Sequence, residues 1–264
     1  MKSLMKLLVA ASLAASPVFA FAAEGDKEFE PTVGQAGKDV VWVPTPPALV
    51  EKMLDVAKVT PKDFVMDLGS GDGRNIIAAA KRGARARGVE YNPEMVALSR
   101  RSAERAGVAD KAEFVQGDMY VADISQASVL AIFLLPENMD KLVKNFLAMK
   151  PGSRIVSNTF AATGWEADES GRSDGDCGSW CNWLLWYVPA QAAGRWRMQG
   201  GDLVLEQKFQ MLTGSYTVDG KEHTVMKGRL RGDQISFTAG GKEYTGRVGD
   251  DAMAGNGWNA TRVK

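Results

Sequence analysis

A glycine-rich turn between a short apolar run and a helical pattern constrains the fold of this chain more than any other feature. Residues 67–73 (DLGSGDG) end the apolar run 63–68 and precede a helical pattern over 75–82. Glycine lets the backbone turn sharply and approach a ligand, and the following helix presents unpaired N–H groups at its start. The order strand, glycine turn, helix predicts the first unit of a parallel α/β sheet.

The same alternation of strand and helix continues to about residue 160. Strands are predicted at 86–90, 112–116, 128–135 and 153–158, and helices at 93–106 and 137–149. Short, largely apolar strands between helices are typical of a doubly wound sheet that is covered on both faces. An earlier helix is predicted to begin at Thr45, as its cap, with Pro46 and Pro47 in the first turn.

The character of the chain changes near residue 160. Residues 161–181 are rich in Gly, Ser and acids, and a solvated acidic loop is favoured over a site for a basic substrate or a cation. Residues 182–264 read as about seven short strands with turn pairs between them, which predicts an antiparallel β domain, a small barrel or half-barrel. If that barrel closes, its first and last strands become neighbours. Arg262 then stacks on Trp196, although a solvated terminal charge is an equal alternative.

The first 23 residues are typical of a secretory signal peptide. They carry Lys2 and Lys6, then an apolar run too short to cross a bilayer, then small residues up to Ala23. This pattern predicts a periplasmic or secreted protein with no stable membrane insertion after cleavage. Residues 24–40 are expected to form a flexible arm ahead of the α/β domain at 41–160.

Composition excludes several function classes. The chain has 32 Lys and Arg against 32 Asp and Glu, and removing the signal segment leaves 30 against 32, because that segment holds two Lys and no acid. Such neutrality argues against a nucleic-acid partner. One His and two Cys exclude a His-rich metal site, so no metal is expected. Cys177 and Cys181 can form a small-loop disulfide in an oxidising compartment, and a redox pair stays open as an alternative.

Two acids follow neighbouring predicted strands. Glu90 ends the second strand, 90 − 69 = 21 positions after Gly69, where a carboxylate can accept both hydroxyls of a ribose. Asp118 follows the third strand, where it can accept from an adenine amine while Met119 packs on the ring. Ligands bind at the carboxyl ends of the strands in open α/β sheets, so the three features predict one nucleoside site.

Residues 65–79, 88–93 and 117–119 resemble the motifs of class I S-adenosylmethionine-dependent methyltransferases. The resemblance implies a Rossmann-like methyltransferase sheet with S-adenosylmethionine as cofactor. It puts the three turn glycines against the methionine part, and Asp67 near the loop or the cofactor's ammonium. The implied cofactor-binding residues are Asp67, Gly69, Ser70, Gly71, Gly73, Glu90, Asp118 and Met119.

A narrower resemblance points to an acceptor. Residues 43–46, 134–136 and 152–156 resemble the small protein-lysine methyltransferases of the ATP synthase c subunit and adenine nucleotide translocase, a match over about residues 40–165. The β region resembles an extension in bacterial exported methyltransferase-like proteins. Residues 133–136 (FLLP) replace the Asn/Asp-Pro-Pro-aromatic motif of enzymes that methylate bases or amides, which argues against those acceptors. The substrate-side candidates are Pro44, Thr45, Phe133, Leu134, Leu135 and Pro136.

The sequence predicts a methyltransferase without naming its catalytic residue. In-line methyl transfer needs positioning and desolvation, and a dry cavity favours a neutral lysine, so no general base is assigned. The acceptor is a protein or a small molecule, and the oligomeric state stays open. The alternative is an exported binding protein with a retained nucleoside pocket and a lipocalin-like β domain, motivated by the cytoplasmic origin of S-adenosylmethionine. Four tryptophans, at 165, 180, 183 and 186, indicate either an aromatic substrate cleft or a packed interface.

Overall fold

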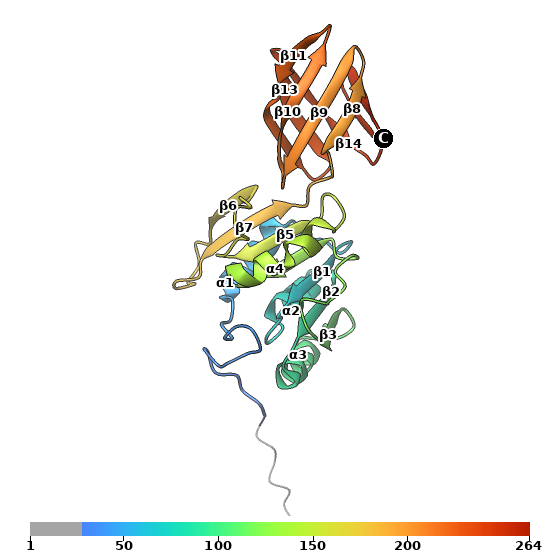
Figure 1. Ribbon diagram of the computed structural model, residues 1–264. Helices are drawn as coiled ribbons and strands as arrows, with labels where there is room; N and C mark the ends of the chain where they lie inside the picture. Colours follow the sequence, from blue (N-terminus) through green and yellow to red (C-terminus); the bar gives the residue numbers. More distant parts are fainter. Residues whose placement is uncertain (1–27) are drawn as a thin grey trace, which may run out of the picture.

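The computed structural model describes residues 28–264, so the predicted signal segment 1–23 lies outside the described residues, as does the start of the predicted arm. Within this range the chain forms an α/β sheet followed by an antiparallel sheet that closes on itself (Figure 1). No helix in the described part is long and apolar enough to cross a membrane.

The α/β half follows the predicted alternation. Its elements are α1 (Pro47–Val56), β1 (Phe64–Leu68), α2 (Arg74–Lys81), β2 (Arg85–Glu90), α3 (Pro93–Arg105), β3 (Ala112–Gln116), β4 (Val129–Ile132), α4 (Pro136–Leu147), β5 (Arg154–Asn158), β6 (Glu169–Arg172) and β7 (Asn182–Tyr187). The strands lie in the order β3-β2-β1-β4-β5-β7-β6. The strands β1 to β5 pair in parallel, and β7 runs antiparallel to both β5 and β6.

Alternating side chains of the strands bury against helices on opposite faces. Val65 of β1 and Val129 of β4 belong to the core under α1, α2 and α3. Met66 and Leu130, the next residues, belong to the core under α4. This alternation confirms the prediction of a doubly wound, Rossmann-like sheet.

Two local predictions in this half are wrong. The fourth strand ends at Ile132, because Pro136 opens α4 and leaves Leu135 extended, with φ −64° and ψ 155°. Residues 133–135 are therefore a loop at the carboxyl edge of the sheet. Thr45 does not cap α1, whose N-cap position is Pro46, and its hydroxyl instead lies 3.5 Å from Asn158 Nδ2.

The structure also moves the start of the β domain. The expected boundary at residue 182 falls inside the first sheet, since β7 pairs with β5 and buries Leu185 and Trp186. The predicted acidic loop likewise contains β6, and two of its acids are paired rather than free. Asp168 and Glu169 form ion pairs with Arg229 and Arg231 of the second domain.

The second domain is a closed barrel. Its strands are β8 (Gly194–Met198), β9 (Gly201–Lys208), β10 (Met211–Val218), β11 (Lys221–Thr224), β12 (Met226–Arg231), β13 (Gln234–Ala239), β14 (Lys242–Val248), β15 (Ala252–Gly255) and β16 (Trp258–Arg262). Pairing of β9 with β10 completes a ring of eight strands in the described chain, with β11 added at the edge of β10. The barrel lies beyond β5 and β7, away from β3 (Figure 1).

Closure brings Arg262 onto Trp196, as predicted. The two residues are register partners in β16 and β8, and the guanidinium carbon lies 4.1 Å from the Trp196 ring centroid. The guanidinium also donates to the carbonyls of Ala193 and Gln191, at 2.7 and 2.8 Å. Trp196 is fully buried, so this contact seals one end of the barrel core.

The barrel interior is a packed core. Phe237 stacks on Tyr244 at 4.8 Å between ring centroids, and Trp258 meets both rings edge-on. Tyr216 of β10 packs against Tyr244 of β14. These side chains fill the space that a lipocalin-like binding protein needs for its ligand, which argues against the alternative function.

Candidate functional site

A cavity of about 260 Å³ opens at the carboxyl edge of the α/β sheet. The strand order reverses between β1 and β4, and both strands lead directly into its wall. Three groups of residues line it: the strand-end loops, residues 35–43, and an aromatic group. The lining residues at and after the strand ends are Gly69, Val89, Glu90, Tyr91, Asn92, Gly117, Asp118, Met119, Phe133, Leu134 and Leu135, and Met95 of α3 joins them.

The glycine turn is tied to the end of β2. The N–H groups of Gly69 and Ser70 both donate to the Val89 carbonyl, and Ser99 Oγ donates to the Gly71 carbonyl. All three glycines of the turn have positive φ, between 54° and 82°. Only glycine adopts this conformation without strain, which explains the sequence pattern.

The three glycines face different surroundings. A side chain at Gly69 would reach only Leu134, at 3.6 Å, and Gly69 lines the cavity. A Cβ at Gly71 would lie 2.6 Å from the Trp42 indole nitrogen, and one at Gly73 would collide with Phe114. Gly69 is therefore the glycine of the turn that a ligand can approach closely. At Gly71 and Gly73 a side chain would collide with neighbouring side chains, so packing requires glycine there.

Glu90 is held by the backbone on both sides. Its Oε2 accepts from Gly71 N and its Oε1 accepts from Asn92 N, both at 2.9 Å. Each carboxylate oxygen can accept a further hydrogen bond, and Glu90 lines the cavity. Glu90, which the sequence predicts as the ribose acceptor, therefore lies in the cavity at the end of β2, where it also fixes the glycine turn.

Asp118 lies in the same cavity and contacts a residue from the N-terminal segment. Its Oδ2 accepts from Lys38 Nζ at 2.6 Å and its Oδ1 accepts from Tyr120 N at 2.9 Å. The hydrogen bond from Lys38 is the main cause that lowers the pKa of Asp118. Met119, the next residue, also lines the cavity.

Asp67 is a buried acid with one unused oxygen. Its Oδ2 accepts from Asn75 Nδ2 at 3.0 Å, while its Oδ1 has no hydrogen-bond partner within the described residues. Burial raises the pKa of Asp67 well above its usual range, and the charges of Glu90 and Asp72 raise it further. Ser70 is buried as well and packs toward Gly88, so neither Asp67 nor Ser70 lines the cavity.

The substrate-side candidates divide into two groups. Phe133, Leu134 and Leu135 line the cavity because the chain leaves β4 before them. Pro44, Thr45 and Pro136 do not line it. Thr45 is buried, and its carbonyl accepts from Arg74 Nη1 at 2.7 Å. It therefore links the segment before α1 to the start of α2 and does not face the cavity.

Residues 35–43, which we call the strap, were not predicted as part of the site. The strap folds back on itself through hydrogen bonds between Gly34 and Trp42 and between Gln35 and Trp42, and it lines the cavity throughout. Lys38 reaches Asp118 and lies 5.0 Å from the Tyr91 ring centroid. Residues 35–40, expected as the end of a flexible arm, thus form part of a wall of the site, and their sequence gave no signal of that.

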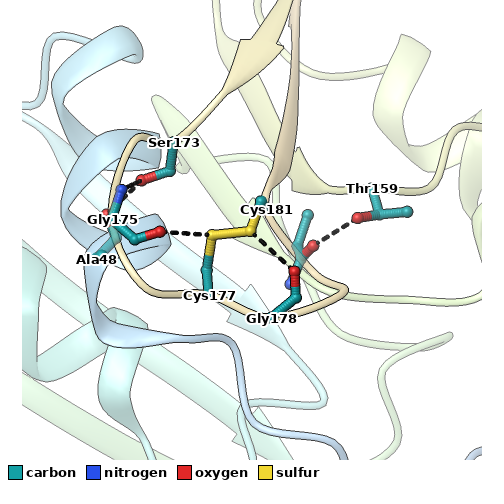
Figure 2. The surroundings of a disulfide bond; sticks show 8 residues. Ala48, Thr159, Ser173, Gly175, Cys177, Gly178 and Cys181 are labelled. Atoms are coloured by element: carbon teal, nitrogen blue, oxygen red, sulfur yellow. Dashed lines mark hydrogen bonds between the residues drawn. A yellow bond between two sulfur atoms is a disulfide. The ribbon is translucent and has the colours of Figure 1, made fainter.

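Phe160 and Trp180 complete the lining. Phe160 follows Thr159, whose φ of 60° turns the chain at the end of β5. Trp180 lies in a loop closed by a disulfide between Cys177 and Cys181, shown in Figure 2. The sequence left the four tryptophans as either a substrate cleft or a packed interface, and the structure contains both. Trp180 lines the cavity, whereas Trp165 and Trp186 are buried near the second domain.

Comparison with known proteins agrees with this geometry. The model of the ANTKMT methyltransferase domain matches residues 67–169. A protein-lysine N-methyltransferase of Saccharolobus islandicus is 43% identical over 134 residues, covering 49% of this chain and 83% of the relative. The mouse lysine N-methyltransferase of the ATP synthase c subunit is 36% identical, covering 49% of this chain and 54% of the relative, so the chain spans about half of that protein.

A solved structure extends the comparison to the bound cofactor product. It is described as an RNA methyltransferase from Salinibacter ruber in complex with S-adenosylhomocysteine, and it is 41% identical. It covers 56% of this chain and 95% of its own, with a TM-score of 0.53. S-adenosylmethionine is the cofactor of this methyltransferase fold. Through its α/β half, the chain belongs to the family of ANTKMT-type S-adenosylmethionine-dependent methyltransferases.

Proposed function

We propose that this protein transfers a methyl group from S-adenosylmethionine to the side-chain amine of a lysine in a protein. The observation that carries the proposal is a single cavity with two chemically different ends. The strand-end loops supply Glu90 and Asp118 at one end, and Phe133, Phe160 and Trp180 supply an aromatic wall at the other. Such a cavity can hold a nucleoside and an alkyl amine together.

The residues present fit the cofactor. Glu90 can accept from ribose hydroxyls, and Asp118 from the adenine amine, with Met119 against the ring. Gly69 leaves room for the ligand beside the turn, and the unpaired Oδ1 of Asp67, buried behind the cavity lining, can attract a nearby ammonium without touching it. When bound, S-adenosylmethionine supplies an electrophilic methyl group. The chain then has to position the acceptor nitrogen and to keep water out.

A lysine acceptor is favoured by the wall of the cavity and by the relatives. An amine that enters among Phe133, Leu134 and Trp180 loses its water, which lowers its pKa and favours the neutral nucleophile. The relatives named above as lysine methyltransferases act on proteins, whereas the Salinibacter ruber protein is described as acting on RNA. Among the described lining residues Lys38 is the only basic one, and it already pairs with Asp118, so phosphate has little to bind.

The test separates protein from RNA as acceptor. The purified full chain is incubated with S-adenosylmethionine carrying a tritiated methyl group, together with an extract of its native cells. We expect label in the protein fraction, recovered after acid hydrolysis as methyl-lysine. Label that is sensitive to ribonuclease would overturn the lysine assignment, and failure to bind S-adenosylhomocysteine in calorimetry would overturn the methyltransferase.

We further propose that the protein works outside the cytoplasm. Two observations support export: the signal-like pattern of residues 1–23, and the disulfide between Cys177 and Cys181, a bond typical of oxidising compartments. Mass spectrometry of the protein from its native cell should find an N-terminus between Phe21 and Glu24. An intact Met1 form in the cytosolic fraction would refute export, and it would also explain the supply of the cofactor.

A further inference from the structure

Three aromatic side chains from separate segments meet in the cavity. Phe133 follows β4, Phe160 follows β5, and Trp180 lies in the disulfide loop. Their ring centroids lie 5.5 to 6.0 Å apart in each of the three pairings. All three line the cavity, so they form one continuous aromatic wall there.

These rings differ from the other aromatic clusters of the chain. Trp186, Trp196 and Phe237 are at most 1% exposed and fill cores. Phe133, Phe160 and Trp180 stay partly exposed because their surroundings open into the cavity. Since burial of such large side chains stabilises a fold, rings kept partly exposed in a concave site indicate a ligand surface.

The chemistry of the cavity defines the ligand. Aromatic faces attract ammonium groups, and quaternary ammonium groups are recognised in proteins by clustered aromatic rings. Lys38 is the only basic side chain among the described lining residues, and it pairs with Asp118, so no basic side chain of this lining is left to bind an anionic ligand. An alkyl chain that ends in an amine or a methylated ammonium satisfies both properties.

We propose that Phe133, Phe160 and Trp180 are the acceptor subsite, which receives an aliphatic amine and holds its methylated ammonium. This rests on the proposed function, which it deepens by naming the residues that select the acceptor. Trp180 is the specificity-determining member, because it comes from a loop outside the parallel strands that build the rest of the site.

The disulfide fixes Trp180 in this position. Trp180 N donates to the Cys177 carbonyl at 3.0 Å, and both half-cystines are buried. The far end of the loop is held where Ser173 N donates to the Cys181 carbonyl and Thr159 N to the Asn182 carbonyl, each at 2.9 Å. Figure 2 shows the bridge between α1 on one side and Thr159 on the other. The bond therefore makes acceptor binding depend on the oxidised loop.

Choline provides a direct probe, and 3,3-dimethylbutan-1-ol is its uncharged isostere. In the full chain saturated with S-adenosylhomocysteine, calorimetry should detect choline binding that exceeds binding of the isostere. Trp180→Ala should weaken choline binding about tenfold, while Trp180→Phe should retain it within about threefold. Trp183→Phe, a partly buried tryptophan three positions along the chain that does not line the cavity, is the matched control and should change nothing.

Reduction tests the role of the disulfide. Dithiothreitol converts Cys177–Cys181 to two thiols and is itself oxidised to its cyclic disulfide. Choline affinity should fall, the double variant Cys177→Ser/Cys181→Ser should reproduce that fall, and S-adenosylhomocysteine affinity should not change. Choline binding that is absent, or equal in wild type and Trp180→Ala, overturns the subsite. Failure of S-adenosylhomocysteine to bind overturns the methyltransferase instead, while Trp180-dependent choline binding would still support the subsite.

Discussion

Asp67 shows how a single buried side chain can serve binding at the expense of stability. Burial raises its pKa, and the nearby carboxylates of Glu90 and Asp72 raise it further. The folded state therefore holds this proton up to a higher pH than the unfolded state does. For an acid with a raised pKa, stability is highest below the unfolded pKa and declines as pH rises toward the folded one.

Asp67→Asn should remove this pH dependence. An Asn oxygen can still accept from Asn75, so we expect the free protein to unfold at equal or higher urea concentration at neutral pH. Because the variant has no carboxylate that can ionise and attract the cofactor's ammonium, S-adenosylmethionine affinity should fall by about tenfold. Asp110→Asn, at an exposed position, is the control. A variant that unfolds earlier at pH 7 and binds normally would show that Asp67 is structural.

Glu90→Ala should affect both the ligand and the turn. The change leaves Gly71 N and Asn92 N without their acceptor and removes the proposed ribose contact. We expect S-adenosylhomocysteine affinity to fall by about 1.5–3 kcal/mol and the free energy of unfolding by about 1–2 kcal/mol. Glu94→Ala, an exposed acid on the following helix, should do neither. Wild-type affinity in Glu90→Ala, measured by calorimetry, would remove the cofactor site from this strand end.

Gly69 has a natural control in Gly107. Their φ angles are 72° and 69°, and an added Cβ has room at both positions, but only Gly69 lines the cavity. Gly69→Ala and Gly107→Ala should each lower the free energy of unfolding by about 1–2 kcal/mol. Only Gly69→Ala should also weaken S-adenosylhomocysteine binding. Equal binding in both variants would mean that the ligand does not approach Gly69.

Elements whose patterns are local could be predicted from the sequence, and those fixed by distant contacts could not. The turn 67–73, Glu90 and Asp118 follow from strand ends in series, because parallel strands bring their carboxyl ends to one edge. The strap was missed because its position depends on contacts with Asp118 and Tyr91, far along the chain. For Trp180 the sequence left a substrate cleft and a packed interface as alternatives, because no local pattern shows which way its loop turns.

The strap competes for a carboxylate that the cofactor is proposed to use. The Lys38 ammonium and an adenine amine both need Asp118, and the Lys38 contact is solvent-exposed. Lys38→Ala should therefore tighten S-adenosylhomocysteine binding, by about two- to fivefold, while Asp118→Ala weakens it. Lys58→Ala, at an exposed lysine outside the cavity, is the control. Weaker binding in Lys38→Ala would show that the strap clamps the ligand rather than competing with it.

At the scale of the molecule, the sequence predicted two domains but not how they join. The sequence left a barrel and a half-barrel open, and the structure has the closed form, with Arg262 on Trp196. The junction depends on long-range pairs instead. Trp165 stacks on Phe209 at 5.2 Å, and Gln210 Nε2 donates to the Glu166 carbonyl at 2.7 Å. The sequence predicted solvated charges at Asp168 and Glu169 because their arginine partners lie about sixty residues later in the chain.

The pair of Asp168 and Arg229 should decide whether the two domains unfold together. Asp168 is 2% exposed and accepts from Tyr187 N and from Arg229 Nη2, at 2.9 and 2.7 Å. Arg229→Ala leaves this buried carboxylate without its cation, so the free energy of unfolding should fall by about 1–3 kcal/mol. Calorimetry should then show one transition splitting into two, because the barrel keeps its own core.

Arg231→Ala is the control: it breaks a more exposed pair with Glu169 and should lower the free energy of unfolding by under about 1 kcal/mol. In Asp168→Asn the Arg229→Ala change should cost much less, and an undiminished cost there would mean that Arg229 stabilises the junction by packing rather than by charge.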